Sequence, residues 1–242
     1  MHLRCLALSA LRGFFEARDF LEVSTPVRLP TPALEDYIEA EPSADKWLRT
    51  SPELHMKRLL AAGYERIFQI GPCFRRGERG ACHLPEFTML EWYRQGANWR
   101  DVLADTIGAF QAVALSCLGS LECRFRGRRI DLAAPWPELT VEEAFRRFAG
   151  IDVDETLANG CFEQVLVDAV EPCLGLERPT ILSEYPLGGT GLSKPLVGRH
   201  DRAERWELYV AGLELANACS ELTDHAEQVR RFQRTERLRR EE

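Results

Sequence analysis

Apolar residues recur along the chain at two periods, which predicts a mixture of helices and strands. Spacings of three and four indicate amphipathic helices, and several of these segments also carry start signals. Ser51-Pro52-Glu53, for example, combines a hydroxyl cap, a proline in the first turn and an acid at the positive end of a helix. We expect helices over Leu3–Phe15, from Ser51 to Gly63, and over Trp99–Leu118, Thr140–Phe148, Phe162–Val170 and Asp224–Glu242.

Strand signals lie between these helices, and several come in pairs joined by short turns. Glu204–Glu221 is one such pair, with a turn expected at Ala211-Gly212. The other expected strands are Phe20–Val23, Ile67–Ile70, Glu86–Tyr93, a hairpin over Cys123–Leu132 around Gly127, and Thr180–Leu182. Hairpins with helices between them predict an α+β fold in which helices flank an antiparallel sheet. We expect residues 1–242 to form a single domain.

The composition is that of an ordinary globular protein, and it narrows the possible partners. The 242 residues carry a formal net charge of −7, which disfavours extensive contact with a nucleic-acid backbone. We find no apolar run that could cross a bilayer and no signal peptide before Phe20, so we expect a cytoplasmic protein without a membrane partner. The eight cysteines include no CxxC pair, so we expect free thiols and no zinc site.

A charged loop, Arg75–His83, lies between two expected strands and could hold a nucleotide. It contains three arginines, whose forked guanidinium groups match phosphate oxygens, and glycines that let the backbone approach a ligand. Phe87 on the following strand could stack on a base. A solvated hairpin loop is the alternative that these residues leave open.

Two groups of acidic residues suggest binding sites for cations. Glu207 and Glu214 lie on the last pair of expected strands, and two carboxylates held together there would suit magnesium. Glu53 lies on a helix, whereas Glu91 and Tyr93 share one face of a strand, and this set would suit a ligand with ammonium groups. The alternatives are glutamates that point to water and ordinary structural salt bridges.

Several strings of residues carry a family resemblance. Two of them, Phe20–Pro26 and Phe74–Glu91, resemble the first and second signature motifs of the class II aminoacyl-tRNA synthetases. Two others, Thr50–Arg58 and Glu214–Asp224, resemble the lysyl branch of that class, and the strings His55–Leu60 and Glu91–Arg94 are similar to its stand-alone paralogue. That paralogue, elongation factor P (R)-β-lysine ligase, attaches its amino acid to elongation factor P. The resemblance covers almost the whole chain.

The resemblance implies an ATP-dependent ligase that activates lysine or (R)-β-lysine as an aminoacyl-adenylate and transfers it to a lysine side chain of elongation factor P. Arg75 would bind the α-phosphate and the activated carboxylate and would be the catalytic residue. The other implied contacts are Glu78, His83 and Phe87 for ATP, Glu207 and Glu214 for Mg²⁺, and Glu53, Glu91, Tyr93, Asn217 and Glu221 for the lysine-like substrate. A homodimer is implied as well, whereas tRNA is not an expected partner.

This interpretation requires that residues distant in the sequence lie close together in the fold. Catalysis would rest on positioning and on stabilisation of charge, so no protein nucleophile is required. Arg75 and the pair Glu207 and Glu214 must then converge on one cavity large enough for a triphosphate.

The sequence also departs from the family pattern. It begins at the first motif, without a preceding anticodon-binding domain, and the glycine-rich third motif is not found before Glu242. Cys82, Leu84 and Cys219 stand where the resemblance leads us to expect other residues, and Cys219 bears on the choice of substrate. The alternatives are the catalytic core of a tRNA-charging lysyl-tRNA synthetase and a non-catalytic pseudo-synthetase.

Overall fold

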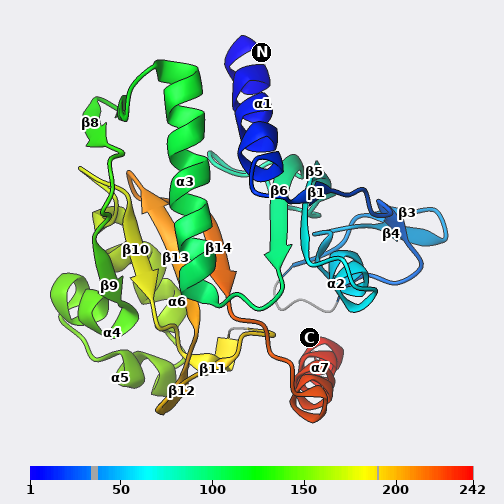
Figure 1. Ribbon diagram of the computed structural model, residues 1–242. Coiled ribbons are helices and arrows are strands. Elements are labelled where there is room, and N and C mark those ends of the chain that lie inside the picture. Colours follow the sequence, from blue (N-terminus) through cyan, green and yellow to red (C-terminus); the bar gives the residue numbers. More distant parts are fainter. Residues whose placement is uncertain (34–37, 190, 242) are drawn as a thin grey trace. The chain divides into compact units, whose positions relative to one another are not determined.

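The computed structural model describes residues 1–33, 38–189 and 191–241, and it divides into two compact units (Figure 1). Unit 1 comprises Met1–Leu11 and Ala97–Asp224, and unit 2 comprises Arg12–Gly96 and His225–Glu242. Each unit has a sheet of its own and is described by itself. The expectation of a single domain over residues 1–242 stays a prediction.

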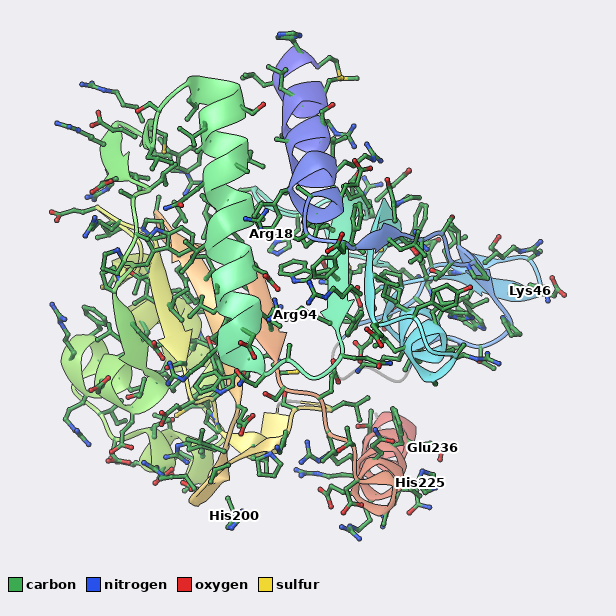
Figure 2. All side chains as sticks on the ribbon, viewed as in Figure 1. Arg18, Lys46, Arg94, His200, His225 and Glu236 are labelled. Atoms are coloured by element: carbon green, nitrogen blue, oxygen red, sulfur yellow. The ribbon has the colours of Figure 1, made fainter. Side chains whose placement is uncertain are left out.

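The sheet of unit 2 has three strands, β1 (Leu21–Glu22), β5 (Arg66–Phe74) and β6 (Glu86–Arg94), in the order β1-β5-β6. β1 lies parallel to β5, and β5 and β6 form the antiparallel hairpin that their sequence pattern predicts. A smaller sheet has the order β2-β4-β3, from Arg28–Leu29, Lys46–Leu48 and Pro42–Ser43. Figure 2 shows Lys46 at the outer end of this smaller sheet.

Aromatic side chains cover one face of the β5–β6 hairpin. Phe15 from α1 (His2–Glu16) is fully buried and stacks on Phe68 with 5.0 Å between the ring centroids. Its ring also contacts Trp92, the cross-strand partner of Phe68, at 5.3 Å. Because side chains alternate along a strand, this packing leaves the opposite face of the hairpin to the odd-numbered residues from Phe87 to Tyr93.

The start of α2 (Glu53–Ala61) differs in detail from the prediction. The sequence predicts Ser51 as the cap, but Pro52 occupies the N-cap position and makes no side-chain bond to the helix. The Ser51 Oγ atom instead accepts a hydrogen bond from the Glu53 backbone N–H at 3.2 Å. The hydroxyl therefore still satisfies one of the N–H groups that a helix start leaves without a partner.

The main sheet of unit 1 has four strands in the order β14-β13-β10-β9. Their bounds are Leu213–Cys219, Arg205–Val210, Thr180–Ser183 and Glu138–Thr140, respectively. β13 is antiparallel to both of its neighbours, whereas β9 and β10 are parallel. The predicted turn between β13 and β14 is confirmed, because Ala211 and Gly212 both have positive φ angles, 53° and 72°, as a two-residue hairpin turn of the primed type requires.

Two short hairpins and several helices complete the chain. The hairpins are β7–β8 (Glu122–Phe125 and Arg128–Asp131) and β11–β12 (Pro195–Leu196 and Arg199–Ala203). The shorter helices are α4 (Val141–Ala144), η1 (Phe145–Ala149), α5 (Val153–Ala158), α6 (Phe162–Val165), η2 (Leu166–Val170), η3 (Glu171–Cys173) and η4 (Leu187–Gly189). In unit 2, α7 (His225–Glu241) confirms the predicted charged helix, and Glu242 lies outside the described residues. Figure 2 shows His200 beside the outer end of β12.

The predicted helices Thr140–Phe148 and Phe162–Val170 form with a mixed hydrogen-bond pattern. Thr140 and Glu143 exchange hydrogen bonds in the predicted capping box, and α4 then continues as the wider, π-type turn η1. α6 continues in the same way as η2. Both predictions of a helix are therefore confirmed.

The helix α3 (Trp99–Leu118) packs in unit 1 against β14 and β7 (Figure 1). Asn98 caps it by accepting hydrogen bonds from the N–H groups of Arg100 and Asp101, and Gly119 ends it with a φ of 67°. By length and composition α3 could also cross a membrane, which corrects the expectation that the chain has no such run. A single helix of this kind is weak evidence for a membrane span, because core helices of other proteins pass the same test.

Gly175 supports the turn of the β13–β14 hairpin and should not tolerate a side chain. Its φ is +69°, and a Cβ atom there would lie 2.4 Å from the Tyr209 carbonyl oxygen. Its own carbonyl accepts the Ala211 N–H at 2.8 Å. We expect Gly175→Ala to lower the free energy of unfolding by about 2–4 kcal/mol, since the left-handed backbone and a clash with immovable main chain both contribute.

Gly160→Ala is the matched control, measured by urea denaturation in parallel. Gly160 has a similar φ of +66°, but its Cβ would meet no atom within 4 Å. It should therefore lose only about 1 kcal/mol, the backbone part of the effect. Equal losses in the two variants would contradict the close approach at Gly175.

Candidate active site

The loop after β5 brings Arg75 next to Phe87. The Arg75 backbone N–H donates to the Pro85 carbonyl at 2.9 Å, which extends the β5–β6 ladder by one residue. The guanidinium carbon of Arg75 lies 5.2 Å from the centre of the Phe87 ring. The Arg75 Nη1 atom lies 3.9 Å from a carboxylate oxygen of Glu78. Three of the residues predicted to bind ATP are thus gathered at one end of the hairpin.

The hydrogen-bond partners of Arg75 suggest that its side chain binds an anion. Its Nε atom is buried and has no hydrogen-bond partner among the residues that the structure describes. A buried N–H without a partner is costly and calls for an explanation. The Nε atom itself has no surface that a ligand could reach, but 26% of the Arg75 side chain is exposed, so the outer guanidinium nitrogens could bind phosphate oxygens.

His83 lies near the tip of the same loop. Its side chain is exposed on the loop, with the imidazole Nδ1 about 4 Å from where a Cβ at Gly80 would stand. The His83 carbonyl accepts the Gly80 N–H at 3.2 Å, which closes the tip of the loop. A contact of His83 with ATP therefore stays a prediction.

Two of the predicted ammonium-binding residues, Glu91 and Tyr93, lie on the same face of the hairpin as Phe87. Phe87, Glu91 and Tyr93 pair across the ladder with Cys73, Gln69 and Ile67, respectively, so their side chains share one face. The Tyr93 hydroxyl donates to the Glu91 Oε1 atom at 2.6 Å. The face thus carries an aromatic ring at one end and a carboxylate–phenol pair further along the strand.

A lysine of the chain itself lies among these groups. The Lys57 ammonium is 2.6 Å from the Glu53 Oε1 atom and 5.9 Å from the centre of the Tyr93 ring. The two residues are four apart on α2, a spacing at which opposite charges meet. Our sequence analysis missed Lys57, although this spacing could have revealed it. Its position shows that the carboxylate and phenol can accommodate an ammonium group.

In unit 1, a β-bulge arranges the second acidic group. Glu207 pairs with Asn217, whereas Tyr209 pairs with Glu214, so one extra residue of β14 is accommodated between these two pairs. As a result Glu214 and Asn217 share a face although they are three residues apart, and the Asn217 amide donates to the Glu214 carboxylate at 3.0 Å. Glu221 follows β14 and forms an isolated backbone bridge with Ser193.

Glu207 is buried, with both of its oxygens bound. Its Oε2 atom accepts hydrogen bonds from the hydroxyls of Tyr185 and Tyr209, each at 2.6 Å. Its Oε1 atom lies 2.7 Å from the Arg205 guanidinium. Sequence reasoning missed Tyr185 and Arg205. Arg205 could have been proposed, because residues two apart on a strand share a face, whereas Tyr185 comes from the segment after another strand.

Negative charge accumulates around Glu207. Partial dehydration raises the pKa of Glu214, although its side chain keeps an exposed edge, and the charge of Glu207 raises it further. The pKa values of Glu171 and Glu163 are also raised, first by burial and then in part by Glu207. Burial and the same carboxylate hold the pKa of Tyr209 well above its usual range. A bound cation would relieve this excess.

The two predicted metal ligands fit a magnesium ion only in partnership with a substrate. In the described part of the chain, no group of three or more His, Cys, Asp or Glu side chains could hold a metal ion by itself. Magnesium, however, is often held by one or two carboxylates and completed by water and phosphate oxygens. Glu207 Oε1 has lone-pair capacity beyond its bond to Arg205, and Glu214 is exposed, so the pair suits that arrangement.

The structure therefore brings the predicted residues together in two places. Arg75, Glu78 and Phe87 form one group in unit 2, with Glu91 and Tyr93 further along β6 and Glu53 at the start of α2. Glu207, Glu214 and Asn217 form the other group, in unit 1. Convergence of the two groups on one cavity stays a prediction.

Comparison with known proteins identifies the class. Residues 1–242 match the sequence model of the family described as tRNA synthetases class II (D, K and N), and the chain belongs to that family. The predicted α+β class, with helices flanking antiparallel strands, is confirmed.

Within the family, the similar proteins include lysine–tRNA ligases. That of Magnetococcus marinus is 34% identical over 261 residues, and that of Moorella thermoacetica is 35% identical over 257 residues. These alignments cover 96% and 95% of this chain but 51% and 52% of the relatives, so the chain spans about half the length of the curated relatives it matches. The lysine–tRNA ligase of the more distant Methanoculleus marisnigri is 31% identical over 98% of the chain. The resemblance to the lysyl branch is thus confirmed, and that to its stand-alone paralogue stays a prediction.

Proposed function

We propose that this chain is the catalytic part of an ATP-dependent ligase that joins lysine or (R)-β-lysine to AMP as an aminoacyl-adenylate. The observation that carries the proposal is the partly exposed Arg75 side chain beside the Phe87 ring, on the same hairpin as the Glu91–Tyr93 pair. Phe87 and Glu91 are four residues apart, or about 14 Å along a strand. That span suits an adenine at one end and the amino group of an amino acid at the other.

The reaction needs orientation and charge stabilisation from these residues. The substrate carboxylate attacks the α-phosphorus, the bond to the β-phosphate oxygen breaks, and pyrophosphate leaves. Arg75 can bind the α-phosphate and the attacking carboxylate together, which holds them in line and stabilises the negative charge between them. Glu207 and Glu214 would hold magnesium, whose charge would stabilise the leaving pyrophosphate.

The remaining proposed contacts are those that the family resemblance implies. Phe87 would stack on adenine, and Glu78 and His83 would hold ATP from the loop between β5 and β6. Glu91 and Tyr93 would bind one ammonium group of the substrate, in the way that Glu53 and Tyr93 lie around Lys57. Glu53, Asn217 and Glu221 complete the proposed substrate contacts.

The proposed acceptor is a lysine side chain of elongation factor P, whose amine would attack the adenylate, form an amide and release AMP. The similarity of His55–Leu60 and Glu91–Arg94 to the stand-alone paralogue supports it, as does the net charge of −7. We further propose a homodimer in the cytoplasm, with no membrane partner. The names of the relatives favour a second candidate, the catalytic core of a tRNA-charging enzyme. A non-catalytic pseudo-synthetase is the third reading.

Isotope exchange between pyrophosphate and ATP tests the first half-reaction. We expect exchange that depends on lysine or on (R)-β-lysine, measured with the full chain and with the amino acid omitted as control. Failure with both amino acids would overturn the proposal and leave the non-catalytic reading.

Transfer of the labelled amino acid, with tRNA and elongation factor P present together, tests the second half-reaction. We expect an acid- and base-stable amide on elongation factor P. Label that appears only on tRNA, as a base-labile ester, would replace the proposed acceptor by the tRNA-charging alternative.

A further inference from the structure

Two buried phenols hold a carboxylate in unit 1. Tyr185 is 5% exposed, Tyr209 is fully buried, and Glu207 is 6% exposed. Both hydroxyls donate to the same atom, Glu207 Oε2, at 2.6 Å. Hydrogen bonds to an ionised group are shorter and stronger than those between neutral groups, and these distances lie in that range.

The backbone keeps both phenols in place. Tyr209 lies two residues after Glu207 on β13, so the two side chains leave the strand on one face. Tyr185 follows β10, the neighbouring strand, and its carbonyl accepts the Ala203 N–H at 2.8 Å. The ring of Tyr209 is part of the apolar core formed with Val141, Phe145 and other buried residues. Any movement of the Glu207 side chain would therefore break its hydrogen bonds to the two phenols.

The two carboxylate oxygens of Glu207 have different numbers of hydrogen-bond partners. A carboxylate has about four lone-pair positions, two on each oxygen. Two phenols occupy those of Oε2, whereas Oε1 meets the single Arg205 guanidinium. A further ligand therefore finds its free position on Oε1.

We infer that Tyr185 and Tyr209 are positioning residues that lock Glu207 so that its Oε1 atom alone meets the magnesium ion of the ATP complex. The inference rests on the proposed function and adds to it the two residues that select the coordinating atom. A free glutamate side chain has several rotamers, and fixing one costs up to ~2 kcal/mol of entropy. The phenols fix that rotamer before the ligand arrives, as partners of metal ligands do in other proteins.

Binding of Mn²⁺ in the presence of a non-hydrolysable ATP analogue tests this inference without catalysis. The electron paramagnetic resonance signal of free Mn²⁺ gives the dissociation constant. We expect Tyr185→Phe and Tyr209→Phe each to weaken binding about 10- to 100-fold, the usual loss when a partner of a metal ligand is removed. Tyr64→Phe is the matched control, because Tyr64 is 47% exposed and lies in unit 2, and it should bind like the unchanged chain.

A double-mutant cycle separates positioning from a general effect on the fold. In a Glu207→Gln background, Tyr209→Phe should cause no further loss of Mn²⁺ affinity, since the carboxylate that Tyr209 positions for the metal is gone. The magnesium concentration for half-maximal pyrophosphate exchange should rise in the single variants and not in the control. Thermal melting shows whether each variant is folded. If a tyrosine variant does not fold, Glu207→Asp replaces it in the Mn²⁺ measurement, because the shorter side chain withdraws the carboxylate from both phenols.

The outcomes are distinct. Unchanged Mn²⁺ affinity in the folded tyrosine variants, or in Glu207→Asp where it replaces them, would overturn the inference while the proposed function stands. Additive losses in the Glu207→Gln background would also overturn it. If the unchanged chain binds no Mn²⁺ with the ATP analogue and catalyses no exchange, the proposed function itself fails, and the inference with it.

Discussion

Replacing Arg75 with alanine should lower the rate of amino acid-dependent pyrophosphate exchange about 10³-fold or more. The side chain would contact both reacting groups, and its charge would stabilise the transition state. The buried Nε, the neighbouring Phe87 ring and the Glu78 carboxylate already hold the guanidinium in one place. The loss should therefore lie mainly in kcat, with a smaller change in the KM for lysine.

Two further variants show whether the loss of exchange rate comes from the guanidinium group of Arg75 itself. Arg75→Lys keeps the positive charge but loses the fork, so it should recover only a small part of the rate. Arg76→Ala removes the neighbouring arginine, which is exposed and binds Glu39 through its backbone N–H, and it should stay within a few-fold of the unchanged chain. Equal rates for Arg75→Ala and Arg76→Ala would exclude Arg75 as the catalytic residue.

The largest loss of stability is expected for Trp206→Ala. Trp206 is fully buried on β13, and its indole N–H donates to the Trp99 carbonyl at 2.8 Å. Removing the ring leaves a cavity among Ile130, Ile181 and Leu208 and an acceptor without its donor. We expect the free energy of unfolding to fall by about 3–5 kcal/mol in urea denaturation.

Trp206→Phe is the matched variant, because it keeps an aromatic ring and loses the hydrogen bond. It should lose roughly half as much, since most of the contact area remains. If alanine and phenylalanine destabilise the protein equally, the indole bond rather than the packing dominates at this position.

Local signals were sufficient for the longer helices and the two main hairpins. They did not reveal the short elements, namely β2, β3, β4, β9, α5, β11 and β12. The β5–β6 and β13–β14 hairpins were predicted because alternating strands flank a loop or a turn that residues close in sequence determine. The capping box at Thr140 was predicted for the same reason. The shared face of Glu91 and Tyr93 followed from the two-residue period of a strand, and the hydrogen bond between them is consistent with it.

The details of the acidic group could not be predicted from local signals. A period of two would place Glu214 and Asn217 on opposite faces, and the bulge that unites them leaves no distinct trace in the sequence. Tyr185 meets Glu207 across 22 positions of the chain, through the pairing of β10 with β13. Such a contact depends on strand order, which the pattern of apolar residues does not specify.

The way the two units share the chain affects how they can be made. Unit 1 is built from Met1–Leu11 and Ala97–Asp224, and unit 2 from the segments between and after them. No single cut separates the two, so a fragment with one intact unit cannot be obtained by removing one end. On the ribosome, unit 2 lacks α7 until His225–Glu241 has emerged, after all of unit 1 has been synthesised. Unit 2 is therefore completed last, although its larger part, Arg12–Gly96, is synthesised before most of unit 1.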